Sequence, residues 1–483
     1  MRVNQKLELY SLERTLLEAH TIERLEDASP LEVIAPLRLM LAVLHRALQG
    51  PEDIMEVAQW LERGFPHDEI VVYLDTWKHR FDLFDLERPF YQTAGYTNKS
   101  KSIAQLLAER SSGTNKLLFD HTQEEPPLAL TPAEAARALI ARQMLAIPEG
   151  AGYSPSPLGG TAVVIPNGAN LLETLCLNML PYEFKDDDLP IWESEKIRPD
   201  AEQVIMGTAH RYTWMSRLIR LEPEGDFANP RVCFLNYGPA CKQKVGIIHN
   251  PDPMLAYRSD KKTEERRPIN FRSEKAFWRD FTAILPKAEN DLSPKVVFHA
   301  LELMNYLRKD SALSTLVLGA TNDKAKFEFW RMELHILPEA LVANREGDVY
   351  ASLESCLLQA EEMGKTLNSA ARALAGKLVS RGDRDPHKDD VTKMVKSFPT
   401  YAVYWSTLEQ AFPKLLAQLK PDYSNAQVEQ NWLEQVLSAS EKAWTATRQA
   451  AGDDGYALRA IYTAENRLTF ARAKISKRIK EQL

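Results

Sequence analysis

The spacing of apolar residues along the chain predicts helices first and strands later. Residues 10–49, 52–64 and 67–81 carry apolar side chains at helical intervals, so a cluster of helices opens the chain. Between residues 200 and 275 the sequence changes to aromatic and β-branched residues separated by turn signals, a pattern typical of short strands. This order of elements predicts a mixed domain in which helices pack with small sheets.

From about residue 345 the pattern changes again, to long amphipathic segments without any strand signal. Four such segments lie near residues 347–380, 386–420, 425–450 and 453–481. Long helices joined by short connections pack as an up-down bundle. We therefore expect an α+β fold with two domains: a mixed α/β domain in residues 1–344 and a C-terminal four-helix bundle in residues 345–483.

Two loops interrupt the predicted mixed domain. Residues 93–131 are polar and largely without periodicity, and long loops inside folded domains usually carry function or are disordered. The tetrapeptide TPAE at 131–134 then predicts the N-terminus of a helix, with Thr as the cap and Pro at the first helical position. A second loop, residues 150–160, is rich in Gly, Pro and Ser and precedes a predicted strand at 161–165.

The composition is that of a globular protein, with 44% hydrophobic and 26% charged residues among 483. The longest apolar run, residues 37–48, is interrupted by charged residues, and the first 20 residues lack the apolar core of a signal peptide. We therefore expect a cytoplasmic protein. The net charge of −7 is unusual for a protein that binds DNA alone. Any contact with nucleic acid therefore needs local basic loops or an assembly that supplies positive charge.

The residues that most enzymes require are not arranged as a site. The ten histidines are scattered without an HExxH motif, and neither a phosphate-binding GxxxxGK[ST] loop nor a GxSxG elbow occurs. The densest acidic run, residues 186–188, is predicted to be a solvated turn. The four cysteines lack CxxC spacing and are expected to be reduced, although Cys233 and Cys241 could meet across a hairpin. We expect no catalytic site, no metal and no cofactor.

A series of segments, taken in order, resembles the CasA-type large subunit of the type I-E CRISPR surveillance complex, Cascade. The segments are FDLFDLERPFYQ at 81–92, SSGTNKLLFDH at 111–121, GAGYSPSPLGGTAVV at 150–164, NLLETLCLNMLP at 170–181, DPMLAYRSDKK at 252–262 and ATNDKAKFEFWR at 320–331. The opening strand with Trp-Ile-Pro that is usual in this family is absent from the sequence, as are the zinc-type cysteine pairs of some members.

The resemblance implies a non-catalytic subunit that recognises a protospacer-adjacent motif (PAM) in double-stranded target DNA. It further implies that the subunit promotes duplex opening and R-loop formation and recruits the helicase-nuclease. The implied partners are the other Cascade subunits, the guide RNA, the target DNA and the helicase-nuclease, with no membrane. The alternative is a helical scaffold protein that binds guide RNA and protein subunits without reading DNA.

The resemblance also implies which residues make the contacts. Those toward the guide RNA and the neighbouring subunit are Phe119, Asp120 and His121. Those toward the PAM are a glycine loop with Gly150, Ala151 and Gly152, a lysine finger at Lys261 or Lys262, and a wedge at Asn322, Asp323, Lys324 and Ala325. The best-known wedge of the family has glutamine where this chain has Lys324. Without the resemblance, the same segments are also typical of a packed aromatic residue, a plain turn and solvated charge.

Basic residues of the predicted bundle are the implied contacts for the displaced DNA strand. They are Arg372, Lys377, Arg381, Arg472, Lys474, Lys477 and Arg478. A basic stripe on one helix can hold a single strand electrostatically, and it is equally typical of a solvated helix face. The apolar residues of the last segment are expected to pack inside the bundle; they are Leu458, Ile461, Leu468, Ile475 and Ile479.

Overall fold

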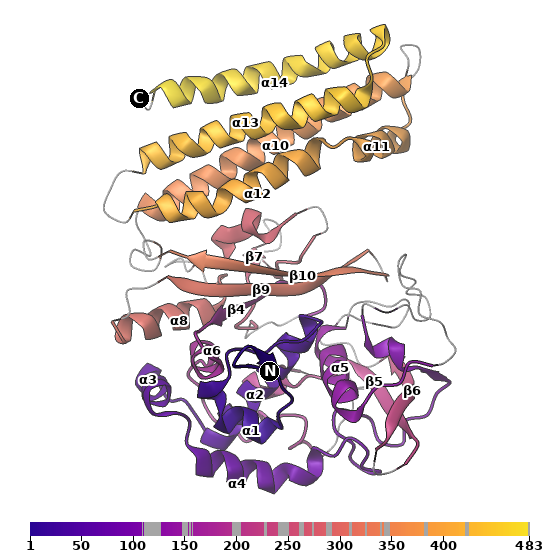
Figure 1. Ribbon diagram of the computed structural model, residues 1–483, viewed down its shortest axis with the longest axis vertical. Coiled ribbons are helices and arrows are strands. Elements are labelled where there is room, and N and C mark those ends of the chain that lie inside the picture. Colours follow the sequence, from indigo (N-terminus) through magenta and orange to yellow (C-terminus); the bar gives the residue numbers. More distant parts are fainter. Residues whose placement is uncertain are drawn as a thin grey trace. The chain divides into compact units, whose positions relative to one another are not determined.

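The computed structural model divides into two compact units, Met1–Ile336 and Leu337–Leu483 (Figure 1). It describes the whole chain except residues 109, 111–126, 147–152, 154–155, 157, 196–203, 227–228, 240–250, 260–264, 273–274, 286–291, 309–311, 324–325, 339–340, 342–347, 381–384, 421–424 and 482–483. The boundary predicted between residues 344 and 345 lies outside the described residues.

Helices form the core of the first unit. They are α1 (Leu12–Leu17), α2 (Leu31–Leu48), α3 (Ile54–Arg63), α4 (His67–Trp77), α5 (Pro132–Leu145), α6 (Leu171–Asn178), α7 (Thr208–Tyr212) and α8 (Lys295–Tyr306). The central helix α2 is buried on nearly every side and packs against α4, α5 and α7. The predicted start of α5 is confirmed, because Thr131 and Glu134 form a reciprocal capping box.

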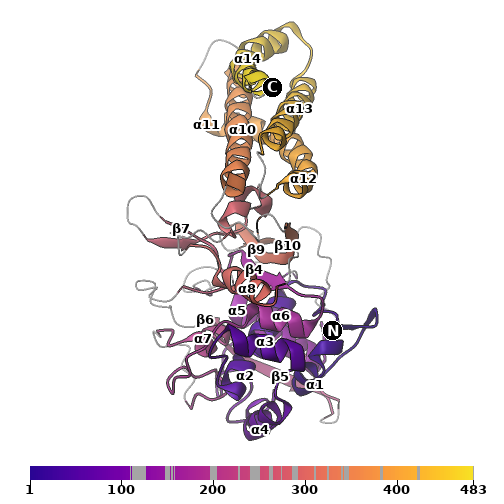
Figure 2. The same cartoon turned by 90° about the vertical axis from the view of Figure 1, so that its left-hand side faces the viewer.

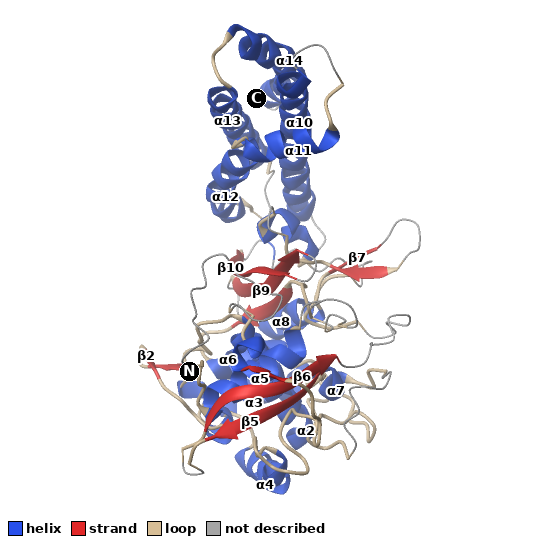
Figure 3. Ribbon diagram, turned by 90° about the vertical axis from the view of Figure 1, so that its right-hand side faces the viewer, coloured by secondary structure: helices blue, strands red, loops and turns tan. Residues whose placement is uncertain are grey.

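Small sheets complete the first unit (Figure 3). Within the described residues the strands are β1 (Arg2–Val3) with β2 (Lys6–Leu7), β3 (Ser100–Ser102) with β6 (Arg231–Pro239) and β5 (Arg217–Glu224), β4 (Val163–Asn167) with β9 (Leu313–Asp323) and β10 (Lys326–Leu337), and β7 (Tyr257–Ser259) with β8 (Arg266–Pro268). The mixture of helices and short sheets confirms the expected α+β class.

The prediction for the acidic run 186–188 is wrong at one residue, Asp188. Asp188 is expected in a solvated turn, but only 1% of it is exposed. Its carboxylate accepts hydrogen bonds from the backbone N–H groups of Ala209 (3.0 Å) and His210 (2.8 Å) and from the Tyr182 hydroxyl (3.1 Å). Asp188 therefore satisfies the first N–H groups of α7 from a distant loop, whereas its neighbours Asp186 and Asp187 are exposed as predicted.

Among its described residues from Asp348 onward, the second unit consists of helices and the loops that join them. Its helices are α10 (Asp348–Ser380), α11 (Lys388–Ser397), α12 (Thr400–Gln418), α13 (Ala426–Ala451) and α14 (Gly455–Glu481). The segment predicted as one helix at 386–420 is two helices, because Pro399 disfavours helical backbone at the preceding residue, Phe398, which is extended (φ −78°, ψ 138°).

Close helix contacts and buried hydrogen bonds hold the bundle together. The Trp432 indole donates to the Cys356 carbonyl (2.7 Å), and the Tyr404 hydroxyl donates to the Ala360 carbonyl (2.8 Å). A methyl group at Gly364 would lie 2.6 Å from Cζ2 of Trp405, so this position requires glycine for α10 and α12 to approach.

The prediction of which residues of α14 face inward is partly wrong. Ile461 and Leu468 are buried as predicted, but 51% of Leu458 is exposed. The helical period explains the difference, because Ala457, Ala460 and Ala464 occupy the inward positions of this stretch and Leu458 lies on another side of the helix.

Candidate nucleic-acid interface

Strand β4 brings together the segments that lead into three predicted DNA-contacting loops. It pairs antiparallel with β9 from Val163 opposite Leu318 to Asn167 opposite Ser314. On its other side, Val163 forms a bridge with Leu255, and Thr161, just before the strand, forms a bridge with Asn270. Chain segments more than 90 residues apart in sequence therefore meet at one strand of five residues.

The glycine loop is anchored at both of its ends. The Ser156 N–H donates to the Ala146 carbonyl at 2.7 Å, which closes the segment between α5 and β4 at its base. Within this segment Tyr153 is described, and its ring stacks on Tyr237 of β6 with centroids 5.9 Å apart and an interplanar angle of 11°. The predicted contacts Gly150, Ala151 and Gly152 lie outside the described residues.

The predicted lysine finger belongs to a short hairpin, here named the finger hairpin, made of β7 and β8. Arg258 opposite Arg267 and Ser259 opposite Arg266 pair antiparallel. Figures 2 and 3 show this hairpin extending outward from the first unit. Lys261 and Lys262 lie in residues 260–264 between the two strands, outside the described residues.

The base of the finger hairpin is firmly held. Tyr257 is buried, and its hydroxyl accepts a hydrogen bond from the Asp252 N–H at 2.8 Å. The Asp252 carboxylate is in turn held by two hydrogen bonds from Arg38 of α2, at 2.8 and 3.1 Å. Burial alone would raise the pKa of Asp252, but the Arg38 guanidinium holds that pKa below its usual range. This buried pair joins the hairpin to the central helix.

The arms of the finger hairpin are basic. Arg258, Arg266 and Arg267 are all exposed. Arg258 also forms an ion pair with Asp280, which in turn contacts Lys275. A locally basic hairpin on a protein of net charge −7 provides the kind of limited positive surface that contact with phosphates requires.

The predicted wedge lies between β9 and β10. Asn322 and Asp323 are the last two residues of β9, and Lys324 and Ala325 lie outside the described residues. Just before these residues, the Thr321 hydroxyl of β9 donates to the Glu328 carboxylate of β10 at 3.2 Å. Two long paired strands therefore carry the predicted wedge position.

A single glycine allows the three segments to meet. A methyl group on Gly319 of β9 would lie 2.2 Å from the Thr161 carbonyl oxygen and 2.7 Å from Cδ2 of Phe271. Thr161 continues the glycine loop, and Phe271 follows the finger hairpin. Gly319 is thus the point at which the strand of the wedge touches the segments of the other two loops.

The residues predicted to contact guide RNA and the neighbouring subunit, Phe119, Asp120 and His121, lie outside the described residues. The last described helical element before them is η3 (Ile103–Leu106). After them, Leu130 forms a bridge with Val232, in which each N–H donates to the carbonyl of the other residue, at 2.9 and 3.0 Å. A small cavity, partly open to solvent, lies beside this region; Leu106, Leu107 and Ala108 are among the residues that line it.

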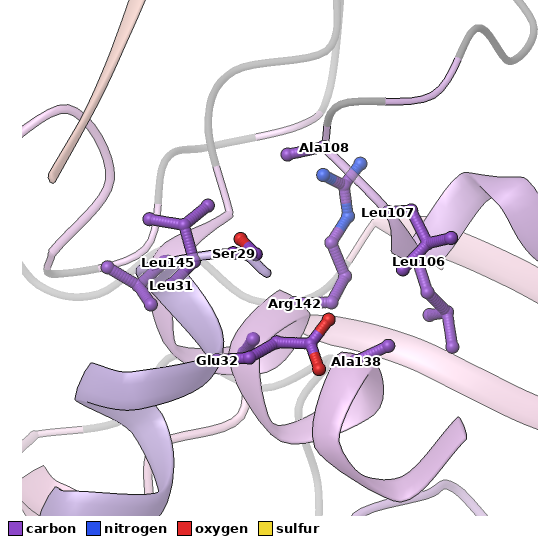
Figure 4. Close-up of a pocket in the computed structure, with 10 residues that line it drawn as sticks. Ser29, Leu31, Glu32, Leu106, Leu107, Ala108, Ala138, Arg142 and Leu145 are labelled. Carbon is purple, nitrogen blue, oxygen red and sulfur yellow. The ribbon is translucent and has the colours of Figure 1, made fainter. Parts of the chain in front are cut away.

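Arg142 of α5 connects this cavity with the glycine loop. Figure 4 shows its side chain between Leu31 and Leu145 on one side and Leu106 on the other. Arg142 and Arg217 both donate to the Tyr237 hydroxyl at 3.1 Å, on the ring that stacks with Tyr153. Sequence reasoning missed this cluster, because Arg142 lies 95 positions before Tyr237.

The cluster also has an electrostatic consequence. Lys101 of β3 lies with its ammonium 5.0 Å from the Tyr237 ring centre. Partial burial, followed by the nearby Arg142 charge, holds the pKa of Lys101 below its ordinary value. Several cations therefore gather on one tyrosine beside the glycine loop.

The basic residues of the bundle differ in their exposure and in their partners. Arg372 and Lys377 of α10 and Lys474 and Lys477 of α14 are exposed. Arg472 instead donates to the hydroxyl (3.1 Å) and carbonyl (2.8 Å) of Ser440 on α13, and burial lowers its pKa. Arg478 lies 3.9 Å from Glu429 of α13, and Arg381 lies outside the described residues.

Two general properties of the described residues bear on the site. No described helix is both long and apolar enough to cross a membrane. Among the residues that the structure describes, no three His, Cys, Asp or Glu side chains gather as a set that could hold a metal ion. Cys233, which could have met Cys241, is a free buried thiol, and Cys241 lies outside the described residues.

The chain is similar to proteins of one family along nearly its whole length. The family described as CRISPR-associated protein Cse1 matches residues 1–443. The CRISPR-associated protein CasA/Cse1 of Thermus thermophilus is 36% identical over 474 residues, which cover 93% of this chain and 91% of that protein. A crystal structure of Thermus thermophilus CasA superposes with a TM-score of 0.83 at 32% identity, covering 98% of this chain and 97% of that one.

A chain of a solved CRISPR RNA-guided surveillance complex has the same fold, with a TM-score of 0.75 at 20% identity over 97% of this chain and 95% of that one. At this identity the likeness concerns the fold alone. The match of the family over residues 1–443, together with the relative at 36% identity, confirms the resemblance seen in the ordered sequence segments. The chain belongs to the Cse1 (CasA) family of CRISPR-associated proteins.

Proposed function

We propose that this chain is the non-catalytic large subunit of a type I-E Cascade that recognises the PAM of double-stranded target DNA. In this role it promotes duplex opening and R-loop formation and recruits the helicase-nuclease. The observation that supports the proposal best is the meeting of three segments at β4 and Gly319. These segments lead into the glycine loop, the finger hairpin and the wedge.

The chemistry of the three elements suits reading of the minor groove. Lys261 or Lys262 can donate to the acceptors that A·T pairs and the cytosine edge present there. Residues Gly150–Gly152 have little or no side chain, which lets backbone groups approach the bases closely. Because the code of the minor groove is degenerate, such a reader accepts several PAM sequences rather than one.

Duplex opening is assigned to the wedge at residues 322–325. Unstacking a base step costs a few kcal/mol. Guide pairing and contacts to the DNA backbone must offset this cost. The exposed arginines of the finger hairpin, Arg258, Arg266 and Arg267, are available for contacts to DNA phosphates.

The net charge supports action within an assembly rather than alone. A chain of net charge −7 has a weak general attraction for DNA. A relative of the same fold is part of a CRISPR RNA-guided surveillance complex. We therefore propose guide RNA and other Cascade subunits as partners, in the cytoplasm, and assign support of the displaced strand to the bundle.

The proposal is tested with the assembled guide complex and targets that differ only in their PAM. The Lys261→Ala/Lys262→Ala variant is expected to lose PAM-dependent binding while assembly survives. Lys185→Ala is a matched control, because this exposed lysine of the first unit pairs only weakly with Glu183 at 3.0 Å. Unchanged PAM preference in the double variant would refute the finger assignment.

A scaffold that binds only guide RNA and protein is the competing function. The exposed apolar side chains of β10 favour it; they are Trp330, Met332, Leu334 and Ile336. The dependence of binding on salt concentration distinguishes the two functions. A DNA reader loses duplex affinity steeply as salt rises, whereas incorporation through an apolar surface does not.

A further inference from the structure

Helix α14 presents aromatic rings to solvent. The exposed fraction is 72% for Tyr462 and 79% for Phe470, whereas Ile461 and Leu468 of the same helix are buried. A helix needs its apolar residues on the inward side, so these two rings contribute nothing to the bundle core. The proposed basic contacts of the bundle leave them unexplained.

The two rings belong to one stripe, here named the stacking stripe. Its members are Arg459, Tyr462, Asn466, Phe470, Lys477 and Lys480, all exposed. At about 100° per residue these positions lie within roughly 40° of one direction on the helix, opposite the buried Ala457, Ala464 and Leu468. The rings are thus interleaved with cations along a single outward line.

The helix has many more basic than acidic residues. Its acidic residues are Glu465, whose carboxylate lies 4.0 Å from Arg448 of α13, and Glu481 at its last position. Three other basic residues of the helix are turned toward neighbours: Arg467 donates to Ser369, Arg472 to Ser440, and Arg478 lies beside Glu429. The stripe itself combines aromatic rings with positive charge.

We propose that the stacking stripe binds single-stranded DNA by base stacking on Tyr462 and Phe470. Arg459, Lys477 and Lys480 then meet the phosphates. The inference rests on the proposed function, in which the duplex is opened, and it names the surface of the bundle that holds the displaced strand. Stacking is indifferent to base identity, which suits a strand whose sequence changes with every target.

The spacing of the rings fits this ligand. Eight residues of helix separate Tyr462 from Phe470, about 12 Å along the axis. A strand that advances about 3.4 Å per stacked nucleotide spans this distance in a few nucleotides. A protein partner would suit the stripe less well, because lysine is depleted at the cores of protein interfaces.

The first test measures binding of the purified chain to a fluorescent oligo-dT strand. Tyr462→Ala/Phe470→Ala is expected to weaken binding about five-fold or more for each ring removed. The control Tyr462→Phe/Phe470→Tyr keeps both rings and is expected to bind like the wild type. Leu358→Ala removes an exposed apolar residue from α10 and is expected to have no effect. Unchanged oligo-dT affinity in the double alanine variant would overturn the proposal.

The second test uses the assembled guide complex on a PAM-bearing duplex. The double alanine variant is expected to form R-loops that dissociate faster, while initial PAM-dependent binding stays unchanged. Loss of PAM dependence in the finger variant alone concerns the proposed function and not the stripe. If the double alanine variant is folded by circular dichroism but fails to enter the complex, the stripe is a protein interface and the proposal is wrong.

Discussion

The substitution Gly319→Ala tests whether the three segments must meet closely. The new methyl group would lie 2.2 Å from the Thr161 carbonyl oxygen and 2.7 Å from Cδ2 of Phe271. The carbonyl is part of the backbone and is fixed by the bridge between Thr161 and Asn270. Relief therefore requires β9 to move away from β4 or the start of the glycine loop to shift.

Two opposing effects determine how much Gly319→Ala changes the free energy of unfolding. Overpacking of a well-packed site costs about 1–3 kcal/mol. Alanine in a strand regains about 0.5–1 kcal/mol relative to glycine, because it loses less backbone entropy on folding. The clash outweighs the entropy gain, which leaves a net destabilisation of about 1–2 kcal/mol. In a domain of a few hundred residues this lowers the melting temperature by roughly 2–4 °C for each kcal/mol.

Thermal unfolding of the purified chain measures the stability change, and PAM-dependent binding by the assembled complex measures the functional one. Gly376→Ala is the matched control, because its new methyl group would lie 3.9 Å from Pro386 and the position is inside α10. We expect the control to be neutral or slightly stabilising, by up to about 1 kcal/mol. Full stability together with full PAM-dependent binding in Gly319→Ala would refute the close approach.

Three further predictions concern charged and titratable side chains. Asp252→Asn leaves the buried Arg38 guanidinium without its carboxylate, so thermal unfolding is expected to show a loss of about 3–5 kcal/mol; a loss below about 1 kcal/mol would contradict the role of this pair. Burial lowers the pKa of His45 and of His299 to about 4, so the unfolded chain, with histidine pKa values near 6.5, binds more protons between pH 6.5 and pH 4. Denaturant unfolding should therefore show stability falling below pH 6.5 by up to about 1.4 kcal/mol per pH unit for each histidine, whereas constant stability between pH 7 and pH 5 would contradict it. Arg472→Ala should lower the melting temperature with little change in oligo-dT binding, and Lys480→Ala should do the reverse, because Arg472 is bonded to Ser440 and Lys480 of the stacking stripe is exposed.

Local signals predicted the parts of this fold that depend on nearby residues. The capping box of Thr131 and Glu134 acts within four residues, and the helical period of α10 and α13 persists over many turns. The break at Pro399 was missed, because the amphipathic pattern continues on both sides of it. Leu458 was misplaced because three alanines nearby are small enough to take the inward positions.

The candidate site depended on contacts that sequence spacing does not contain. Asp188 caps a helix 20 residues later, and the Arg38–Asp252 pair spans 214 residues. The family resemblance located the three loops in the sequence. It did not predict the pairing of β4 with β9 or the bridge from Thr161 to Asn270. These long-range pairings arise from the packing of the whole first unit.

Site-specific photocrosslinking can decide whether the three predicted loops lie at the PAM. A photoreactive p-benzoyl-phenylalanine replaces Ala151, Lys262 or Lys324, one at a time, in the assembled guide complex bound to a PAM-bearing duplex. We expect all three positions to crosslink to the PAM or to the base pair beside it. Crosslinks that reach only guide RNA or protein subunits from these positions would contradict it and favour the scaffold.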